Sequence, residues 1–310
     1  MKPAGSIVFF TTASGAGYGL LFWLGLLRIF GLVPADARFG LVSLGVALLL
    51  ITMGLLSSLA HLGHPERAWR AVSQWRSSWL SREGVAALLT YLPAVLFGIG
   101  LLGEIPALAV PMGLLAAAGA VATVYSTGMI YASLKPIRQW HHPLVVPGYL
   151  VLAAFSGAVL LAMLGAFWGD GAVPAVLALL TGAGGFLLKT AYWRGIDTAP
   201  PEATAESATG LGRIGKVRPL DPPHTQTNYL LREMGFRIAR KHAAKLRRIV
   251  LTAGFGLPML LALVALLTGG PAATALLTLG AILALCGLLV ERWLMFAEAT
   301  HTVTLYYTGT

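Results

Sequence analysis

Eight apolar stretches, each about 20 residues long, dominate the 310-residue sequence. A helix of roughly 20 apolar residues crosses the hydrocarbon core of a bilayer and satisfies its own backbone hydrogen bonds there. The stretches lie at about 15–33, 41–60, 84–103, 107–131, 144–167, 173–193, 249–268 and 272–297. Only 11% of the residues are charged, far below the share in soluble domains. The sequence therefore predicts an all-α, polytopic membrane protein with eight transmembrane helices, which could pair as two four-helix bundles.

The first apolar stretch is expected to remain in the mature protein. Residues 1–33 contain a single lysine and no twin arginine, and their apolar run is longer than the central region of a signal peptide. We therefore treat residues 1–310 as one integral membrane domain.

The basic residues are distributed unequally among the connectors. Connectors 61–83, 132–143 and 194–248 contain 4, 2 and 11 Lys or Arg residues, whereas the other four contain Arg38 alone. Basic loops stay in the cytoplasm, so both termini are expected there, in a bacterial inner membrane. This distribution explains the net charge of +10 better than nucleic-acid binding does, because the basic residues do not form one face of a domain.

The connector at 194–248 is the longest polar segment. It opens with TAPPEATAESATGLG, which is typical of a flexible lead-in, and continues with the basic, helix-like segment NYLLREMGFRIARKHAAKLRRIV. Such a cytoplasmic helix could lie on anionic lipid or form a docking surface for a partner protein.

The connector SLAHLGHPERAWRAVSQWRSSWLSREG, residues 58–84, concentrates titratable groups at a membrane edge. Because consecutive antiparallel helices meet at one membrane face, His61 and Glu83 are expected to lie near each other there. Ionisable residues at the edge of the hydrocarbon are candidates for function, although both could instead cap their helices. Tyr125, Ser126 and Tyr131 could line a pocket or simply pack.

The sequence also argues against several kinds of site. Its one cysteine, Cys286, cannot build an iron–sulfur cluster, and its histidines lie in connectors or near helix ends, where they cannot ligate a haem inside the bundle. Charged residues within the spans, such as Arg28, Lys189 and Arg292, lie towards helix ends, so buried proton relays are not expected.

Four motifs in order resemble the membrane anchor subunit family of dimethyl sulfoxide reductase. They are HLGHPERAWRA with SWLSREG, STGMIYASLKPIRQWHHP, and the ending ERWLMFAEATHTVTLYY. The opening MKPAGSIVFFTTASGAGYGLL is most similar to the branch that anchors cytoplasm-facing, quinone-linked sulfite dehydrogenases. The resemblance implies a subunit that binds quinone or quinol and has no redox cofactor of its own. Iron–sulfur clusters and a molybdenum cofactor would belong to partner subunits docked on the cytoplasmic face.

The resemblance also implies site residues. The family's functional histidine and glutamate correspond to His61 and Glu83, which would relay protons to the quinone. The residues expected to surround the quinone with them are His64, Arg67, Ser81, Arg82 and Tyr131. No metal ligand is expected.

Alternative functions remain open from the sequence. The chain could anchor a reductase that oxidises quinol, transport a solute, or tether enzymes without binding quinone. A transporter would be favoured by broken helices with polar groups at the centre of the membrane, which the sequence does not clearly show.

Overall fold

The computed structural model describes residues 3–60, 64–199, 203–218, 220–221 and 238–304. Eight helices in this part of the chain are long and apolar enough to cross a membrane, which confirms the predicted number of spans. Seven are α1 (Gly5–Ile29), α2 (Ala37–Leu59), α3 (Trp79–Leu102), α4 (Pro106–Ala132), α5 (Val145–Phe167), α6 (Ala172–Thr198) and α11 (Gly270–Ala297). The remaining span combines α9 (Ile238–Ile249), the π-helix η3 (Val250–Gly256) and α10 (Leu257–Thr268). Short helical turns lie outside the membrane at η1 (Pro65–Val72), α7 (Ala205–Thr209), η2 (Leu211–Arg213) and η4 (Thr302–Thr304).

Several spans begin earlier than their apolar stretches, most of all α1 and the span that begins with α9. The first helix begins at Gly5, before the predicted residue 15, and includes the polar segment TTASG. Its hydroxyls are satisfied within the helix, since Thr12 and Ser14 donate to the carbonyls of Val8 and Phe10 at 2.8 and 2.6 Å. Likewise α3 begins at Trp79, so Glu83 lies inside this helix.

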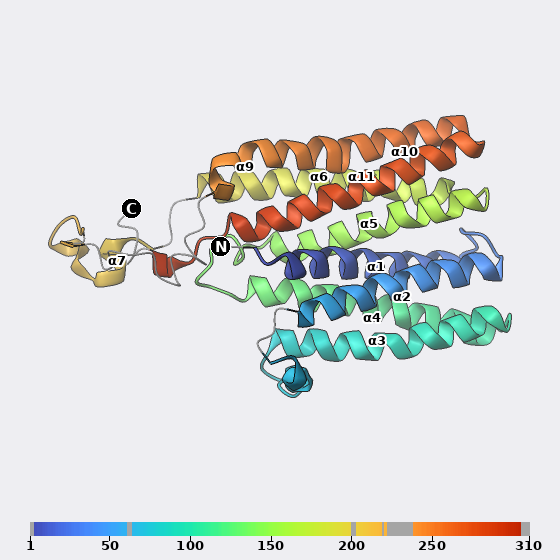
Figure 1. Cartoon of the computed structure of the whole chain (residues 1–310), viewed down its shortest axis with the longest axis horizontal. Helices are drawn as coiled ribbons and strands as arrows, with labels where there is room; N and C mark the ends of the chain where they lie inside the picture. The colour runs from blue at the N-terminus through green and yellow to red at the C-terminus, as the bar shows by residue number, and fades with distance from the viewer. Residues whose placement is uncertain (1–2, 61–63, 200–202, 219, 222–237, 305–310) are drawn as a thin grey trace.

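Helices α1 and α5 form the centre of the bundle (Figure 1). About 72% of the apolar window in α1 and 67% of that in α5 is buried, against at most 39% in the other spans. The first four spans form one group of neighbours and the last four another, and α1 joins them through α5. The two central helices touch at Gly19 and Gly157, where a Cβ on Gly157 would lie 2.0 Å from the backbone of Gly19. This close approach requires glycine.

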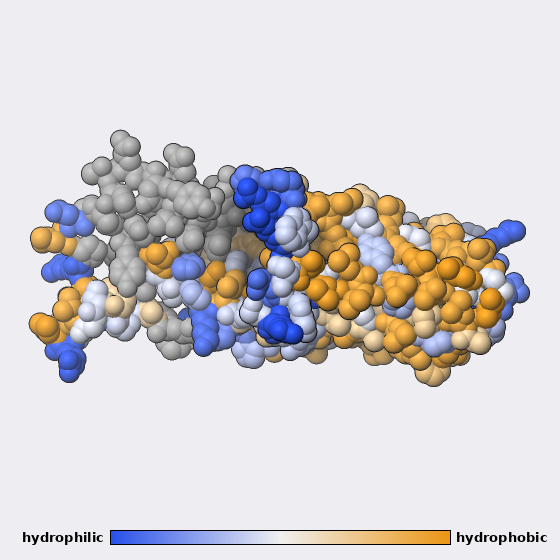
Figure 2. Space-filling model, turned by 90° about the horizontal axis from the view of Figure 1, so that it is seen from below, coloured by the Kyte–Doolittle hydropathy of each residue, from blue (hydrophilic) through white to orange (hydrophobic). Residues whose placement is uncertain are grey.

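The two ends of the bundle differ. The start of α1, the end of α11, and the connectors containing η1 and α7 lie at the left end in Figure 1, which we call the terminus end. On the face seen in Figure 2, hydrophobic residues predominate over the bundle, and a hydrophilic band at the connector with η1 lies where this apolar surface ends. The structure thus places the described parts of the three basic connectors at one end of the bundle, as the charge pattern predicts.

Candidate functional site

The side chain of Glu83 lies inside the bundle near the terminus end. Glu83 is 4% exposed, and its carboxylate accepts a short hydrogen bond from the hydroxyl of Thr127 on α4. Since α3 begins at Trp79 and the carboxylate points to α4, Glu83 does not cap its own helix. A carboxyl group buried among apolar helices is costly unless it is paired or used, so Glu83 is a functional candidate on structural grounds as well.

A narrow polar cavity lies beside Thr127, between α1, α4, α5 and α11. It has about 20 Å³ of space, room for about one water molecule, so a larger ligand would have to move the side chains around it. Its polar wall consists of Thr11, Thr12, Ser14, Tyr18, Thr127, Tyr149, Ser156 and Arg292. Several of these hydroxyls already donate to carbonyls of their own helix, as Ser156 does to Leu152 at 2.9 Å. The cavity therefore has fewer free polar groups than its composition suggests.

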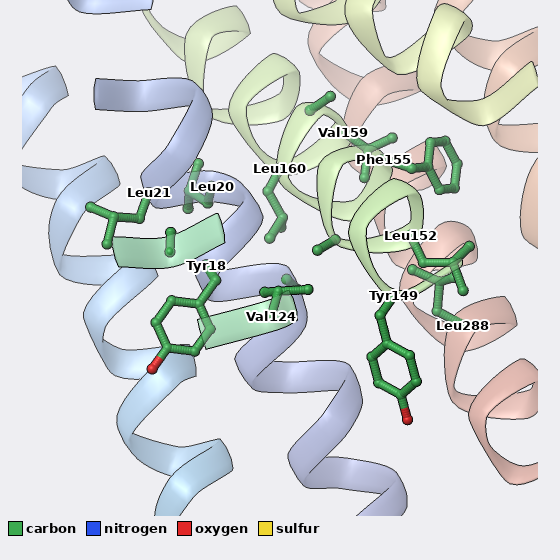
Figure 3. Packing of buried hydrophobic residues seen from close by; sticks show 14 of the residues in the cluster. Tyr18, Leu20, Leu21, Val124, Tyr149, Leu152, Phe155, Val159, Leu160 and Leu288 are labelled. Carbon is green, nitrogen blue, oxygen red and sulfur yellow. The ribbon is translucent and has the colours of Figure 1, made fainter. Parts of the chain in front are cut away.

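Two tyrosine hydroxyls at the cavity have no hydrogen-bond partner within the described part of the chain. They belong to Tyr18 on α1 and Tyr149 on α5, and both are buried. Figure 3 shows the two rings on adjacent helices, with both hydroxyls directed away from the packed leucines and towards the same end of the bundle. Glu83 is close enough to interact electrostatically with both of them. Buried polar groups usually have partners, and the side chain of Thr123 lies within reach of the Tyr18 hydroxyl, while those of Arg292 and Tyr131 lie within reach of the Tyr149 hydroxyl.

Aromatic rings and a guanidinium group form one side of this cavity. The ring of Tyr131 stacks on Tyr149 with centroids 5.7 Å apart, and Phe296 packs edge-on against Tyr131 at 5.3 Å. Arg292 also lies against Tyr149, with its guanidinium carbon 4.3 Å from the centre of the Tyr149 ring.

A buried ionic cluster holds Arg292 in place. Glu291 is fully buried and contacts Lys189 Nζ at 2.6 Å and Arg292 Nε at 2.5 Å. Lys189 also lies over the ring of Tyr192, at 4.1 Å from its centre. The sequence predicts Lys189 and Arg292 towards helix ends, but not that they join Glu291 in a buried ion-pair cluster. Glu291 and Lys189 are 102 positions apart in sequence, and their side chains meet because α6 and α11 both pack against α5.

The structure separates the residues predicted to surround the quinone. Ser81 is buried in α3, and Tyr131 stacks on Tyr149, which lines the cavity. His64 and Arg67 are exposed beside Glu66 in the connector, at 3.0 and 3.7 Å. Arg82 donates to the carbonyls of Trp75 and Arg76 and therefore holds the connector against α3. His61 lies outside the described residues.

Other candidates from the sequence have local partners. Tyr125 is exposed and packs edge-on against Trp79, while Ser126 donates to the carbonyl of Ala122 at 2.9 Å. His142 packs edge-on against Tyr192, and burial together with the positive charges of Lys189 and Arg138 lowers its pKa. Within the described residues, no three His, Cys, Asp or Glu side chains come together as a metal site.

Sequence reasoning missed Tyr18, Thr127, Tyr149 and the cluster around Glu291. The missed signal for Glu291 is an acidic residue inside a 20-residue apolar stretch, which is rare unless the residue is paired or functional. Nothing in the local sequence distinguishes Tyr18 and Tyr149 from packing residues.

Chemically, the cavity offers hydroxyl groups at fixed positions, and Thr127 in its wall connects it to the carboxyl group of Glu83, which can exchange a proton. Tyr149 and Arg292 lie elsewhere in the wall. This arrangement suits a small polar ring that changes its protonation state, because the carboxyl group is placed for general acid–base chemistry.

Comparisons with known proteins show which family the chain belongs to. The family model described as "DMSO reductase anchor subunit (DmsC)" matches residues 2–307. The chain is also 33% identical to a sulfite dehydrogenase subunit from Allochromatium vinosum, over 99% of both chains. The family match covers all eight spans and the connectors between them, including the segment that carries Glu83. The chain therefore belongs to the family of DMSO reductase membrane anchor subunits.

Proposed function

We propose that this chain is the quinone-reactive membrane anchor of a molybdenum oxidoreductase. It would exchange electrons between the quinone pool and an iron–sulfur subunit, which in turn serves the molybdenum-containing catalytic subunit. The similarity to a sulfite dehydrogenase subunit favours a complex that oxidises sulfite, in which electrons flow towards the quinone. An anchor of a DMSO-type reductase, with electrons leaving quinol, is the second candidate and is favoured by the family description.

The observation that carries the proposal is the pairing of Glu83 with Thr127 beside two unpartnered tyrosine hydroxyls. Reduction of a quinone to a quinol takes two electrons and two protons. The Glu83 carboxyl group would donate or accept a proton at one quinone oxygen. The hydroxyl of Tyr149 would donate a hydrogen bond to the other, with the positive charge of Arg292 behind its ring.

The chain's own residues support the assignment of electron-carrying groups to partners. An iron–sulfur cluster generally needs four cysteine ligands, and the sequence has one cysteine, whose side chain is exposed on a membrane-spanning helix. Electrons would therefore reach the quinone from a cluster in a partner docked at the terminus end. Exposed Trp69 and Trp75 with the neighbouring arginines of the connector offer a basic, aromatic surface there.

The terminus end is proposed to face the cytoplasm, since it holds the three basic connectors. Protons would then reach Glu83 from the cytoplasmic side. The family resemblance is the reason for proposing that His61 relays protons together with Glu83.

Replacing Glu83 by Gln in the assembled complex tests the proposal. The amide can still accept the hydrogen bond from Thr127 but cannot exchange a proton, so assembly should survive. Quinone-coupled turnover should fall by about 10²-fold or more. Electron exchange with a soluble dye that bypasses the membrane site should not change.

The matched control is Glu104→Gln, an exposed glutamate at the opposite end of the bundle, which should leave both activities unchanged. Near-normal quinone-coupled turnover in the intact Glu83→Gln complex would remove Glu83 from the site.

A further inference from the structure

A long apolar groove opens towards the lipid between α1, α4, α5 and α6. It contains about 980 Å³ of space, and its walls are formed by Phe22, Ala120, Val121, Leu150, Val151, Ala154, Leu180, Thr181 and Gly184, with others described below. Val121 and Leu180 are 41% and 64% exposed on the surface that the membrane would cover. The groove can therefore be reached from the bilayer.

The groove meets the polar cavity. Tyr18, Val124 and Ala153 line both spaces. Figure 3 shows Tyr18 on α1 and Val124 on α4 close together, with the Tyr18 hydroxyl directed towards the terminus end. The apolar ring of Tyr18 therefore borders the groove, while its hydroxyl belongs to the polar cavity.

We propose that this groove holds the prenyl tail of the quinone whose head ring occupies the polar cavity. The inference rests on the proposed function and adds the path by which the substrate enters and is held. A prenylated quinone has a flat polar head and a long apolar chain, so it needs a polar space that continues directly into a lipid-facing apolar one. The polar cavity and the groove lie on either side of three shared residues, so a tail in the groove places the head ring next to the cavity.

A second, larger groove does not meet this requirement. It lies between α5, α6, α10 and α11 near the loop at Gly269 and has about 1680 Å³ of space. None of its lining residues, which include Ala166, Pro271 and Ile282, also lines the polar cavity. A tail in that groove would have its head at the end of the bundle away from Glu83.

Gly184 on α6 offers a way to fill the tail groove without disturbing the fold. A Cβ placed on Gly184 would have only Val151 Cγ1 within 4 Å, at 3.8 Å, so a larger side chain can extend into the groove. A leucine there would displace roughly two methylene groups of a bound tail from apolar contact. Gly45 on α2 provides the matched control, because it is exposed, lies outside the groove, and its Cβ would meet nothing within 4 Å.

The experiment compares two quinones with the same head ring, one with a long prenyl tail and one with a methyl group in its place. Quinone-coupled turnover is measured in membranes that contain the assembled wild-type, Gly184→Leu or Gly45→Leu complex. Gly184→Leu should raise the KM for the prenylated quinone about tenfold and change that for the tail-less quinone less than twofold. Gly45→Leu should change neither.

Equal KM changes for the two quinones in Gly184→Leu, or no change in either, would overturn the tail site and leave the proposed function intact. A wild-type complex that reacts with the dye but with neither quinone would overturn the proposed function and the tail site together.

A binding measurement keeps the test independent of activity. A prenylated quinone with a photoreactive group in its tail should label peptides that contain residues 120–124 or 180–184 in the wild-type complex. Gly184→Leu should reduce this labelling several-fold. Labelling confined to other helices would contradict the proposal, even if the leucine variant did not assemble.

Discussion

The buried cluster of Lys189, Glu291 and Arg292 makes a prediction about stability. Two positive side chains surround one carboxylate that is fully buried, so the cluster carries one net positive charge. Changing Glu291 to Gln keeps the size of the side chain and leaves both cations without a counter-ion. Removing one partner of a buried ion pair costs about 3–5 kcal/mol, because the remaining charge is desolvated without compensation.

The double variant Lys189→Met/Glu291→Gln provides the control. It removes one positive and one negative charge, so the cluster again carries one net positive charge, on Arg292. It should therefore be more stable than Glu291→Gln alone, by at least about 1 kcal/mol, which is a coupling energy typical of residues in contact.

Thermal unfolding of the purified complex, followed by loss of helical signal, is the assay. At roughly 2 °C per kcal/mol for a chain of this size, Glu291→Gln should lower the Tm by about 6–10 °C. The double variant should recover part of this loss. Two results would refute the reasoning. One is a decrease in Tm of less than about 2 °C in Glu291→Gln. The other is a double variant whose decrease in Tm equals the sum of the decreases in Glu291→Gln and Lys189→Met.

Three further predictions concern topology, cofactors and packing. Reporter fusions at residues 36, 104 and 170 should report the periplasm, and fusions at 75, 138 and 215 the cytoplasm, because the basic connectors share one end of the bundle; a periplasmic signal at 75 would reverse the proposed orientation. The isolated chain should show no haem absorbance and no stoichiometric iron, and a haem b spectrum would contradict the assignment of redox cofactors to partners. Gly157→Ala should destabilise the protein by about 1–3 kcal/mol, since its Cβ would lie 2.0 Å from the Gly19 backbone. Gly45→Ala, in open space, should not destabilise it, and equal Tm values for the two variants would contradict the described contact of α1 with α5.

The number and order of the spans could be predicted because the thickness of the bilayer fixes the length of each apolar stretch. The limits of α1 and α3 could not, because hydropathy treats Thr12, Ser14 and Glu83 as polar. Within the helices these side chains find partners, the first two on their own backbone and Glu83 on Thr127.

The candidate site could be predicted only in part. Glu83 was predicted from its position and from the resemblance, and Tyr131 was named from its position; in the structure Glu83 accepts a hydrogen bond from Thr127 in the cavity wall, and Tyr131 stacks on Tyr149. Thr127 and Tyr149 could not be predicted, because the register between α3 and α4, and between α4 and α5, is set by tertiary packing. His64 and Arg67 share the motif with Glu83, yet they are exposed in the connector, while Glu83 faces α4 inside the bundle.

The central claim is that the cavity beside Glu83 and Thr127 binds quinone. The most direct test is inhibitor competition on the purified wild-type complex, with quinone and the substrate of the catalytic partner varied independently. A ring-shaped quinone-site inhibitor should compete with quinone, so that added quinone restores turnover, and it should leave the soluble-dye reaction unchanged. A complex with full dye activity that neither exchanges electrons with quinone nor responds to the inhibitor would contradict the account and identify the chain as a passive tether.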